Sequence, residues 1–170
     1  MINYKRQSST FVKAMLDFAD NNIINSVMTT QSSVLKARRY CEDKGARFTL
    51  LREKVYTLLI DRNGAMGAYE LLDELKKTED SAKPATIYRA LDFLLEFDLV
   101  HRIESSNAFV ACHHFGCNHP VQFLICESCG DVQEIQSAGM QATLDKQAET
   151  HGFKVKTQTI EAHGICKNCQ

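Results

Sequence analysis

Two Cys-x-x-Cys pairs are the most specific chemical signal in this sequence. Cys126 and Cys129 lie in "FLICESCGDV", between two apolar runs that are typical of strands. Cys166 and Cys169 repeat the spacing in "IEAHGICKNCQ". If the neighbouring strands share one sheet, the four thiolates converge and can hold Zn²⁺ in a closed tetrahedral site at about 2.3 Å. The alternatives are two disulfides or a redox motif, but a redox pair normally opens a helix.

A second group of ligand-type side chains gathers near the middle of the chain. Its members are His101, Cys112, His113, His114, Cys117, His119 and, further along, Glu134. A two-residue turn at residues 106–107 would place His101 directly opposite Cys112 in a hairpin, with their side chains about 5 Å apart. A thiolate facing an imidazole is half of a zinc site. Together with His119 and Glu134, this pair predicts a second metal site between two parts of the protein.

Helical periodicity runs through residues 34–104 and predicts the elements that carry this hairpin. The pattern predicts one helix that Thr49 caps and that ends near Gly64. A second helix has apolar positions between Ala68 and Leu75, and a third begins at Pro84, which suits a first helical turn. Two short strands around a Ser-Asn turn follow the third helix. Three helices and a hairpin predict a winged helix-turn-helix.

The third predicted helix has a polar face that suits DNA. Ala85, Tyr88, Arg89 and Asp92 lie away from its leucines. Small, aromatic and basic groups near a helix N-terminus fit a major groove. A solvated surface helix is the alternative interpretation.

The last 50 residues change pattern. "VQFLIC" and "DVQEI" read as strands, "AGMQATLDKQAETHG" as a helix, and "FKVKTQTIEAHGIC" as a final strand. A β-β-α-β unit of this size needs a metal or a partner chain to stabilise its thin core. We therefore expect an α+β protein whose parts are listed by residue number: 1–32 an N-terminal extension, 33–112 a winged-helix domain, 113–119 a hinge, and 120–170 a small α/β dimerisation domain.

Composition is that of a globular protein, with 44% hydrophobic and 24% charged residues. The net charge is −1, but residues 34–54 are locally basic and acids outnumber bases after residue 107. No apolar run reaches the length of about 20 residues that spans a bilayer. The N-terminus does not resemble a signal peptide, so we expect a cytoplasmic protein with reduced cysteines. Met28 is an alternative translation start.

Three motifs together resemble the ferric uptake regulator family. They are "KPATIYRALDFLLEFDLVHRIES", "FLICESCGDVQEI" and "IEAHGICKNC", and the likeness covers residues 34–170. The last motif is most similar to the zinc uptake regulator branch. The resemblance implies a homodimeric, zinc-activated repressor that binds a double-stranded DNA operator and controls zinc uptake genes. It implies no enzyme activity and no membrane partner.

The resemblance also implies roles for single residues. Cys126, Cys129, Cys166 and Cys169 match the structural zinc ligands, and His101, Cys112, His119 and Glu134 match the regulatory zinc site, giving two Zn²⁺ per subunit. Tyr69 and Arg89 match DNA-contacting positions. We add Thr86 and Tyr88, which lie on the same predicted helix as Arg89. "LLR" at residues 50–52 departs from the family, which usually has a proline there. Cys117 is an extra thiol that either competes with His119 as the fourth regulatory ligand or takes no part in the site. The spacing of His119 from Cys126 fits the zinc branch and favours His119.

Other functions remain open at the level of sequence. An iron, manganese or peroxide sensor of the same family is the main alternative, although the Cys112 thiolate favours zinc over harder ions. A cysteine-based enzyme is a second, but the His-x-Glu and Pro-Cys-x-x-Cys pattern of zinc deaminases is absent. A zinc-storage protein is a third, although storage needs no DNA-reading helix.

Overall fold

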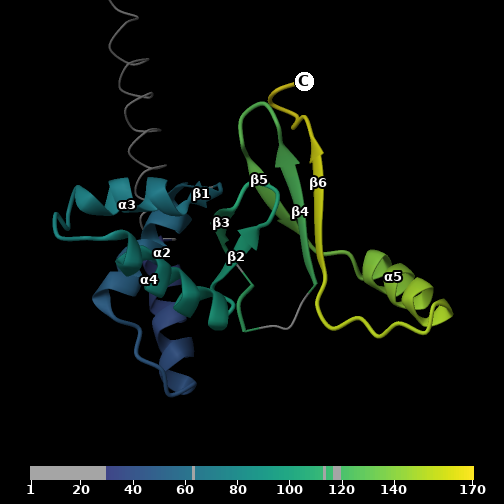
Figure 1. The fold of residues 1–170 in the computed structure, drawn as a ribbon, viewed down its shortest axis with the longest axis horizontal. Coiled ribbons are helices and arrows are strands. Elements are labelled where there is room, and N and C mark those ends of the chain that lie inside the picture. Colours follow the sequence, from purple (N-terminus) through teal and green to yellow (C-terminus); the bar gives the residue numbers. More distant parts are fainter. Residues whose placement is uncertain (1–29, 63, 113, 117–119) are drawn as a thin grey trace, which may run out of the picture.

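The computed structural model describes residues 30–62, 64–112, 114–116 and 120–170. The expected N-terminal extension therefore lies almost wholly outside the described residues, as do Met28, His113, Cys117 and His119. In Figure 1 the helices stand on one side, a three-stranded sheet stands beside them, and the last helix projects from the far side of that sheet.

Four helices build the first half of the protein. One covers residues 30–43, followed by α2 (Leu50–Arg62), α3 (Ala68–Lys76) and α4 (Pro84–Glu96). Their apolar faces form one core, in which Val55, Leu71 and Leu94 are fully buried. The "LLR" departure does not displace the second helix, because the Thr49 hydroxyl accepts the Arg52 N–H at 3.5 Å and caps it.

A small antiparallel sheet completes this half. Strands β2 (Val100–Ile103) and β3 (Ala108–Ala111) form the expected hairpin. The two-residue strand β1 (Met66–Gly67), which the sequence did not predict, pairs with β3 to give the order β1-β3-β2. Helices followed by this hairpin make a winged helix-turn-helix, as predicted.

The predicted register of the hairpin was wrong. Its turn covers four residues, 104–107, because Ile103 pairs with Ala108, and Asn107 takes the left-handed conformation with φ 51°. His101 therefore faces Val110 and not Cys112. The error is a shift of two residues, and side chains alternate with a period of two. Cys112 consequently stays on the same face as His101, as its diagonal neighbour.

The second half contains the predicted β-β-α-β unit. Strands β4 (Val121–Cys126), β5 (Val132–Ile135) and β6 (Thr159–Gly164) form a sheet in the order β5-β4-β6. Strand β6 begins six residues later than the start of "FKVKTQ", so the final strand is shorter than expected. Helix α5 (Ala138–Thr150) has no buried residue and lies apart from the sheet (Figure 1).

The hairpin and the second sheet share an apolar contact. Ile103 and Val110 of the hairpin pack with Phe123 of β4 in one buried cluster. Val121 and Ile125, which point to the same face of β4 as Phe123, surround it. This contact brings the ligand-type residues of both halves to one seam. Among the described helices, none combines the length and the apolar character that a membrane crossing requires.

Candidate metal and DNA sites

The four cysteines of the two Cys-x-x-Cys pairs converge at one end of the second sheet. Strand β4 ends at Cys126 and pairs in parallel with β6, whose last residue, Gly164, lies opposite Cys126. The sulfur atoms of Cys126, Cys129, Cys166 and Cys169 all lie within 4.8 Å of one another. None of these four cysteines forms a disulfide with another described residue, which argues against the disulfide alternative.

The spacing of these sulfurs fits a tetrahedral metal. Cys129 Sγ and Cys166 Sγ are 3.8 Å apart. Zinc–sulfur bonds of about 2.3 Å at tetrahedral angles predict a sulfur–sulfur distance of about 3.8 Å. An all-thiolate set of this shape leaves no position for a reactive water, so the donors suit a structural Zn²⁺.

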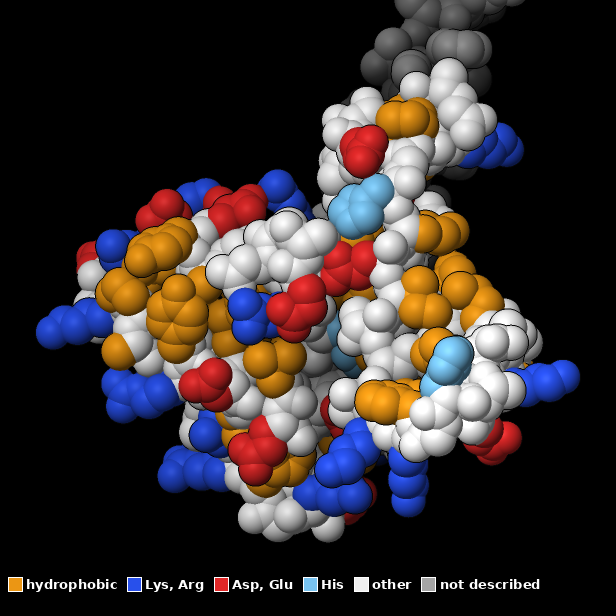
Figure 2. All heavy atoms as spheres, turned by 45° about the vertical axis from the view of Figure 1, so that its right-hand side comes forward, with side chains coloured by type: hydrophobic (Ala, Val, Ile, Leu, Met, Phe, Trp, Pro, Cys, Tyr) orange, Lys and Arg blue, Asp and Glu red, His pale blue; other side chains and the backbone are white. Residues whose placement is uncertain are grey.

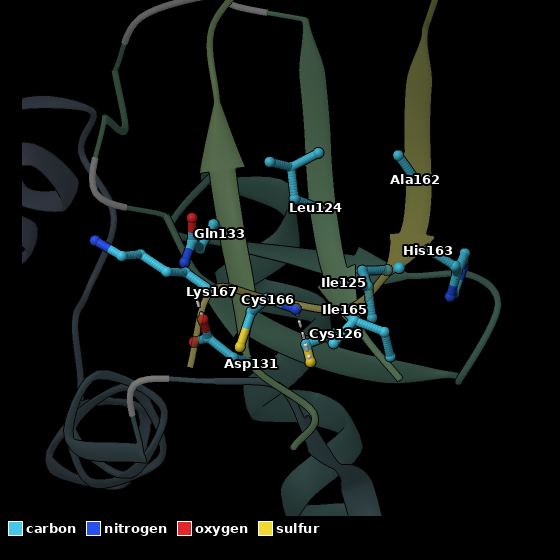
Figure 3. A pocket seen from close by; sticks show the side chains of 11 residues that line it. Leu124, Ile125, Cys126, Asp131, Gln133, Ala162, His163, Ile165, Cys166 and Lys167 are labelled. Atoms are coloured by element: carbon cyan, nitrogen blue, oxygen red, sulfur yellow. Dashed lines mark hydrogen bonds between the residues drawn. The ribbon is translucent and has the colours of Figure 1, made fainter. Parts of the chain in front are cut away.

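Backbone N–H groups tune the sulfurs. The Cys166 N–H donates to Cys126 Sγ at 3.3 Å, drawn as the dashed line that ends at Cys126 in Figure 3. Hydrogen bonds from the backbone of Cys166 and Cys129 lower the pKa of the Cys126 thiol to about 6. The neighbouring Cys169 thiol raises the pKa of Cys166 instead. Cys126 is therefore ready to bind as a thiolate near neutral pH, whereas Cys166 needs the charge of a metal to lose its proton.

A second group forms at the seam. Ligand atoms of His101 on β2, Cys112 after β3 and Glu134 on β5 lie within 4.8 Å of one another. Cys112 is buried, and the Glu134 side chain is only 7% exposed. An imidazole nitrogen, a thiolate and a carboxylate are ligands that Zn²⁺ accepts, so these residues fit a metal site. The fourth expected ligand, His119, lies outside the described residues.

His114 makes a contribution that the sequence did not predict. Its backbone N–H donates to Cys112 Sγ at 3.3 Å, and its Nδ1 lies 3.7 Å from Glu134 Oε1. Groups that hydrogen-bond metal ligands orient them and tune their charge. The two histidines after Cys112 indicated possible metal ligands in the sequence. The hydrogen bond to Cys112 could not be predicted from them, because its donor is a backbone N–H, which nearly every residue has.

The expected DNA-contacting residues lie on two helices. Tyr69 at the start of α3 is 70% exposed, and Tyr88 and Arg89 are exposed on α4. The Thr86 hydroxyl accepts the Lys83 N–H at 3.4 Å as part of a capping box, and so helps to begin α4. Thr86 and Arg89 line one hollow with Thr49 and Arg52. The structure thus brings Thr86 and Arg89 together, while Tyr69 lies on another helix.

Comparison with known proteins agrees with this architecture. The model of the ferric uptake regulator family matches residues 43–169. The zinc uptake regulation protein of Escherichia coli (strain K12) is 42% identical over 142 residues, covering 83% of each chain. The protein of that name from Mycobacterium tuberculosis (strain ATCC 25618 / H37Rv) is 30% identical over 129 residues, covering 74% of this chain and 96% of its own.

Solved structures give the same result. A zinc uptake regulator complexed with zinc and DNA is 42% identical, with a TM-score of 0.80, over 83% of this chain and 95% of that chain. A crystal structure of holo XcZur is 41% identical, with a TM-score of 0.74, over 81% of this chain and 96% of that chain.

Proposed function

This chain belongs to the ferric uptake regulator family, and we propose that it is a zinc-responsive, DNA-binding repressor of zinc uptake genes. The observation that carries the proposal is the seam group of His101, Cys112 and Glu134, which joins the winged helix to the second sheet. A buried thiolate in this group favours zinc over iron or manganese. The relatives named as zinc uptake regulation proteins support the same metal.

Two Zn²⁺ per subunit are part of the proposal. When bound, Zn²⁺ supplies a positive charge that holds several Cys, His or carboxylate ligands close together. We assign the four converging cysteines to a structural site that stabilises the C-terminal sheet. The seam group, with His119 as its fourth ligand, is the exchangeable regulatory site. The protein acts in the cytoplasm and is not an enzyme.

The proposal includes a coupling of metal binding to DNA binding through the seam group. His101 and Cys112 come from the hairpin and Glu134 from β5, so holding them together fixes the angle between α4 and the second sheet. In a dimer, two copies of α4 must lie about 34 Å apart to enter successive major grooves. Selecting that spacing raises DNA affinity, and by reciprocity DNA raises zinc affinity. A coupling of about 2–3 kcal/mol, or roughly 30- to 150-fold, is enough for a switch.

We propose that the two halves of the protein have different roles. Residues 33–112 read the operator, residues 113–119 act as the hinge, and residues 120–170 form the homodimer. A surface that suits a second copy lies on α5 and the segment after it, where Leu144, Phe153 and Val155 line one hollow. Figure 2 shows apolar side chains on both sides of the molecule, among them a group on the right, the side on which Figure 1 draws α5.

Two equally buried thiols provide the test of this function. Cys112 is 1% exposed and belongs to the seam group, whereas Cys41 is 0% exposed and belongs to neither metal group. We expect Cys112→Ala to raise the free zinc needed for half-maximal operator binding by at least about 30-fold, the lower bound of the coupling above. Cys41→Ala also removes a buried sulfur atom, but it leaves the free zinc needed for half-maximal operator binding unchanged. Fluorescence anisotropy of labelled operator DNA at buffered free zinc measures both.

The metal itself is tested in the same assay. Wild-type protein titrated with Zn²⁺, Fe²⁺ and Mn²⁺ responds first to zinc if the seam group is a zinc sensor. A response to Fe²⁺ or Mn²⁺ at lower free metal would instead support the iron- or manganese-sensing alternative. Operator binding that is equally tight in chelator would contradict metal control altogether.

A further inference from the structure

Glu161 makes a contact between the tip of the hairpin and the second sheet. Its Oε1 accepts the Glu104 N–H at 2.6 Å, and its Oε2 accepts the Ser105 N–H at 3.2 Å. The Glu161 side chain is only 12% exposed. The donors and the acceptor are 56 and 57 residues apart in the sequence, so this contact exists only because the two halves are docked.

The contact belongs to one row of residues that crosses the second sheet. Phe123 on the central strand pairs with Glu134 on β5 and with Glu161 on β6, so the three side chains share a face. The hairpin contacts this row along its whole width. His101 and Cys112 meet Glu134, Ile103 and Val110 pack on Phe123, and the turn amides bind Glu161.

The dimensions of the two parts match. Two strand spacings across the sheet amount to about 10 Å. Three residues along the hairpin, from His101 in β2 to Glu104 directly after it, also advance about 10 Å. The seam group therefore lies at the base of the hairpin, and Glu161 lies at its tip, about 10 Å away.

The contact has the chemistry of an anion site. Two successive backbone N–H groups in a turn form a concave donor pair that favours a negative charge. Burial raises the pKa of the Glu161 carboxyl, but the hydrogen bonds from Ser105 and Glu104 and the nearby His163 outweigh it, so the net pKa lies below the ordinary value. The group is an ionised acceptor at neutral pH, and charge-assisted hydrogen bonds are stronger than neutral ones.

We propose that Glu161 is a positioning residue that holds the wing at its tip, so that the seam ligands and α4 are aligned before zinc or DNA binds. The proposal rests on the function proposed above and deepens it. Without Glu161, the hairpin is held at the metal group and by the apolar contact with Phe123, and its tip can still pivot. The attachment to Glu161, about 10 Å from the metal group, fixes the direction of the hairpin. Loss of the second attachment misaligns His101 and Cys112 relative to Glu134, and the seam group then binds zinc more weakly.

The test uses the full-length, structurally zinc-loaded protein and measures zinc affinity by competition with a chelating dye, without DNA. Glu161→Gln keeps the size of the side chain and one acceptor, and Glu161→Ala removes both acceptors. We expect zinc affinity of the regulatory site to fall about 5- to 20-fold in Glu161→Gln and further in Glu161→Ala. The affinity of the structural site stays unchanged.

Glu104 offers the matched control. Its side chain is 65% exposed and lies at the same turn, while its backbone N–H is one of the two donors to Glu161. Glu104→Gln removes one carboxylate charge from this place and keeps the donor, so zinc affinity stays at the wild-type value. A second readout, amide hydrogen exchange at Glu104 and Ser105, rises in Glu161→Ala and not in Glu104→Gln.

The outcomes separate the two hypotheses. Equal zinc affinities for wild type and Glu161→Ala would overturn the positioning role, even if the amides exchange faster or the variant melts earlier. A wild-type protein that binds operator DNA without a zinc response would overturn the proposed function instead. In that case the dye titration still decides whether Glu161 aligns the seam ligands, because it contains no DNA.

Discussion

Two arginines at the base of the winged helix carry the same charge in different surroundings. Arg52 stacks on Phe93, with its guanidinium carbon 3.5 Å from the ring centroid, and it also donates to the backbone carbonyl of Arg47. Arg89 is exposed on α4, and its Nε donates to the Ala85 carbonyl at 3.2 Å, one turn toward the helix N-terminus. The first guanidinium joins α2 to α4, and the second points toward the end of the helix that suits a DNA groove.

Replacing each arginine should therefore have a different effect. We expect Arg89→Ala to weaken operator binding by about 1–3 kcal/mol and to relax the preference at one base pair, as loss of a bidentate contact to guanine predicts. Arg52→Ala should lower the free energy of unfolding and keep the base preference. Anisotropy titrations against a set of single-base operator variants, with thermal melts alongside, measure both. A uniform loss on every sequence would reduce Arg89 to a phosphate contact.

At the scale of elements, the segment after the hairpin is packed against the first helix. Phe115 lies 5.6 Å from the Tyr40 ring, centroid to centroid. Gly116 follows with φ +83°, and a Cβ at this position would lie 3.1 Å from Tyr40 Cε2. Residues 114–116, the described part of the connector between the two halves, are thus held both by the backbone conformation of Gly116 and by close contact with a helix some 75 residues earlier in the chain.

Gly45 is a control that separates the effect of the backbone conformation from the effect of the contact with Tyr40. It also has a left-handed φ, +73°, but a Cβ there meets nothing within 4 Å. We expect Gly45→Ala to cost about 1–2 kcal/mol from the conformation alone. Gly116→Ala should cost roughly 1 kcal/mol more, because Tyr40 must also move and its packing with Phe115 is disturbed. Urea unfolding of the zinc-loaded protein measures the difference, and equal costs would mean that the connector does not depend on Tyr40.

At the scale of the whole molecule, one chain leaves apolar surface that its own fold does not cover. Phe153 is 67% exposed, and Leu144 and Met140 on α5 are each 38% exposed. Leu144 and Phe153 line a hollow beside α5, on the side of the protein away from the winged helix (Figure 1). An apolar surface of this kind on a small domain is typical of an oligomer interface.

A charge at this surface should separate the copies. We expect Phe153→Glu to shift the protein from dimer to monomer and to weaken operator binding, because one winged helix alone cannot contact two half-sites. Leu35→Glu is the control, since Leu35 is 54% exposed but lies on the helix over residues 30–43. Sedimentation velocity measures the assembly of both variants. A dimeric Phe153→Glu protein would place the interface elsewhere.

Much of this protein was predictable from local pattern. The cysteine spacing, the periodicity of the helices and the alternation in β4 and β5 each depend on residues only a few positions apart. Strand β1 was not predictable, because two residues carry no period. The final strand was predicted too long, since residues 153–158 alternate in the sequence without pairing in the sheet.

Apart from β1 and the helix over residues 30–43, local pattern predicted the helices and strands of this protein and the ligand types that it offers. The position of the hairpin on the second sheet depends on contacts between distant residues, so it became visible only in the folded chain. The turn of four residues shifted the register by two, and the period of a strand kept His101 and Cys112 on one face nonetheless. The contact of Glu161 with the turn left no mark in the sequence, because the donors are backbone groups that every residue except proline carries.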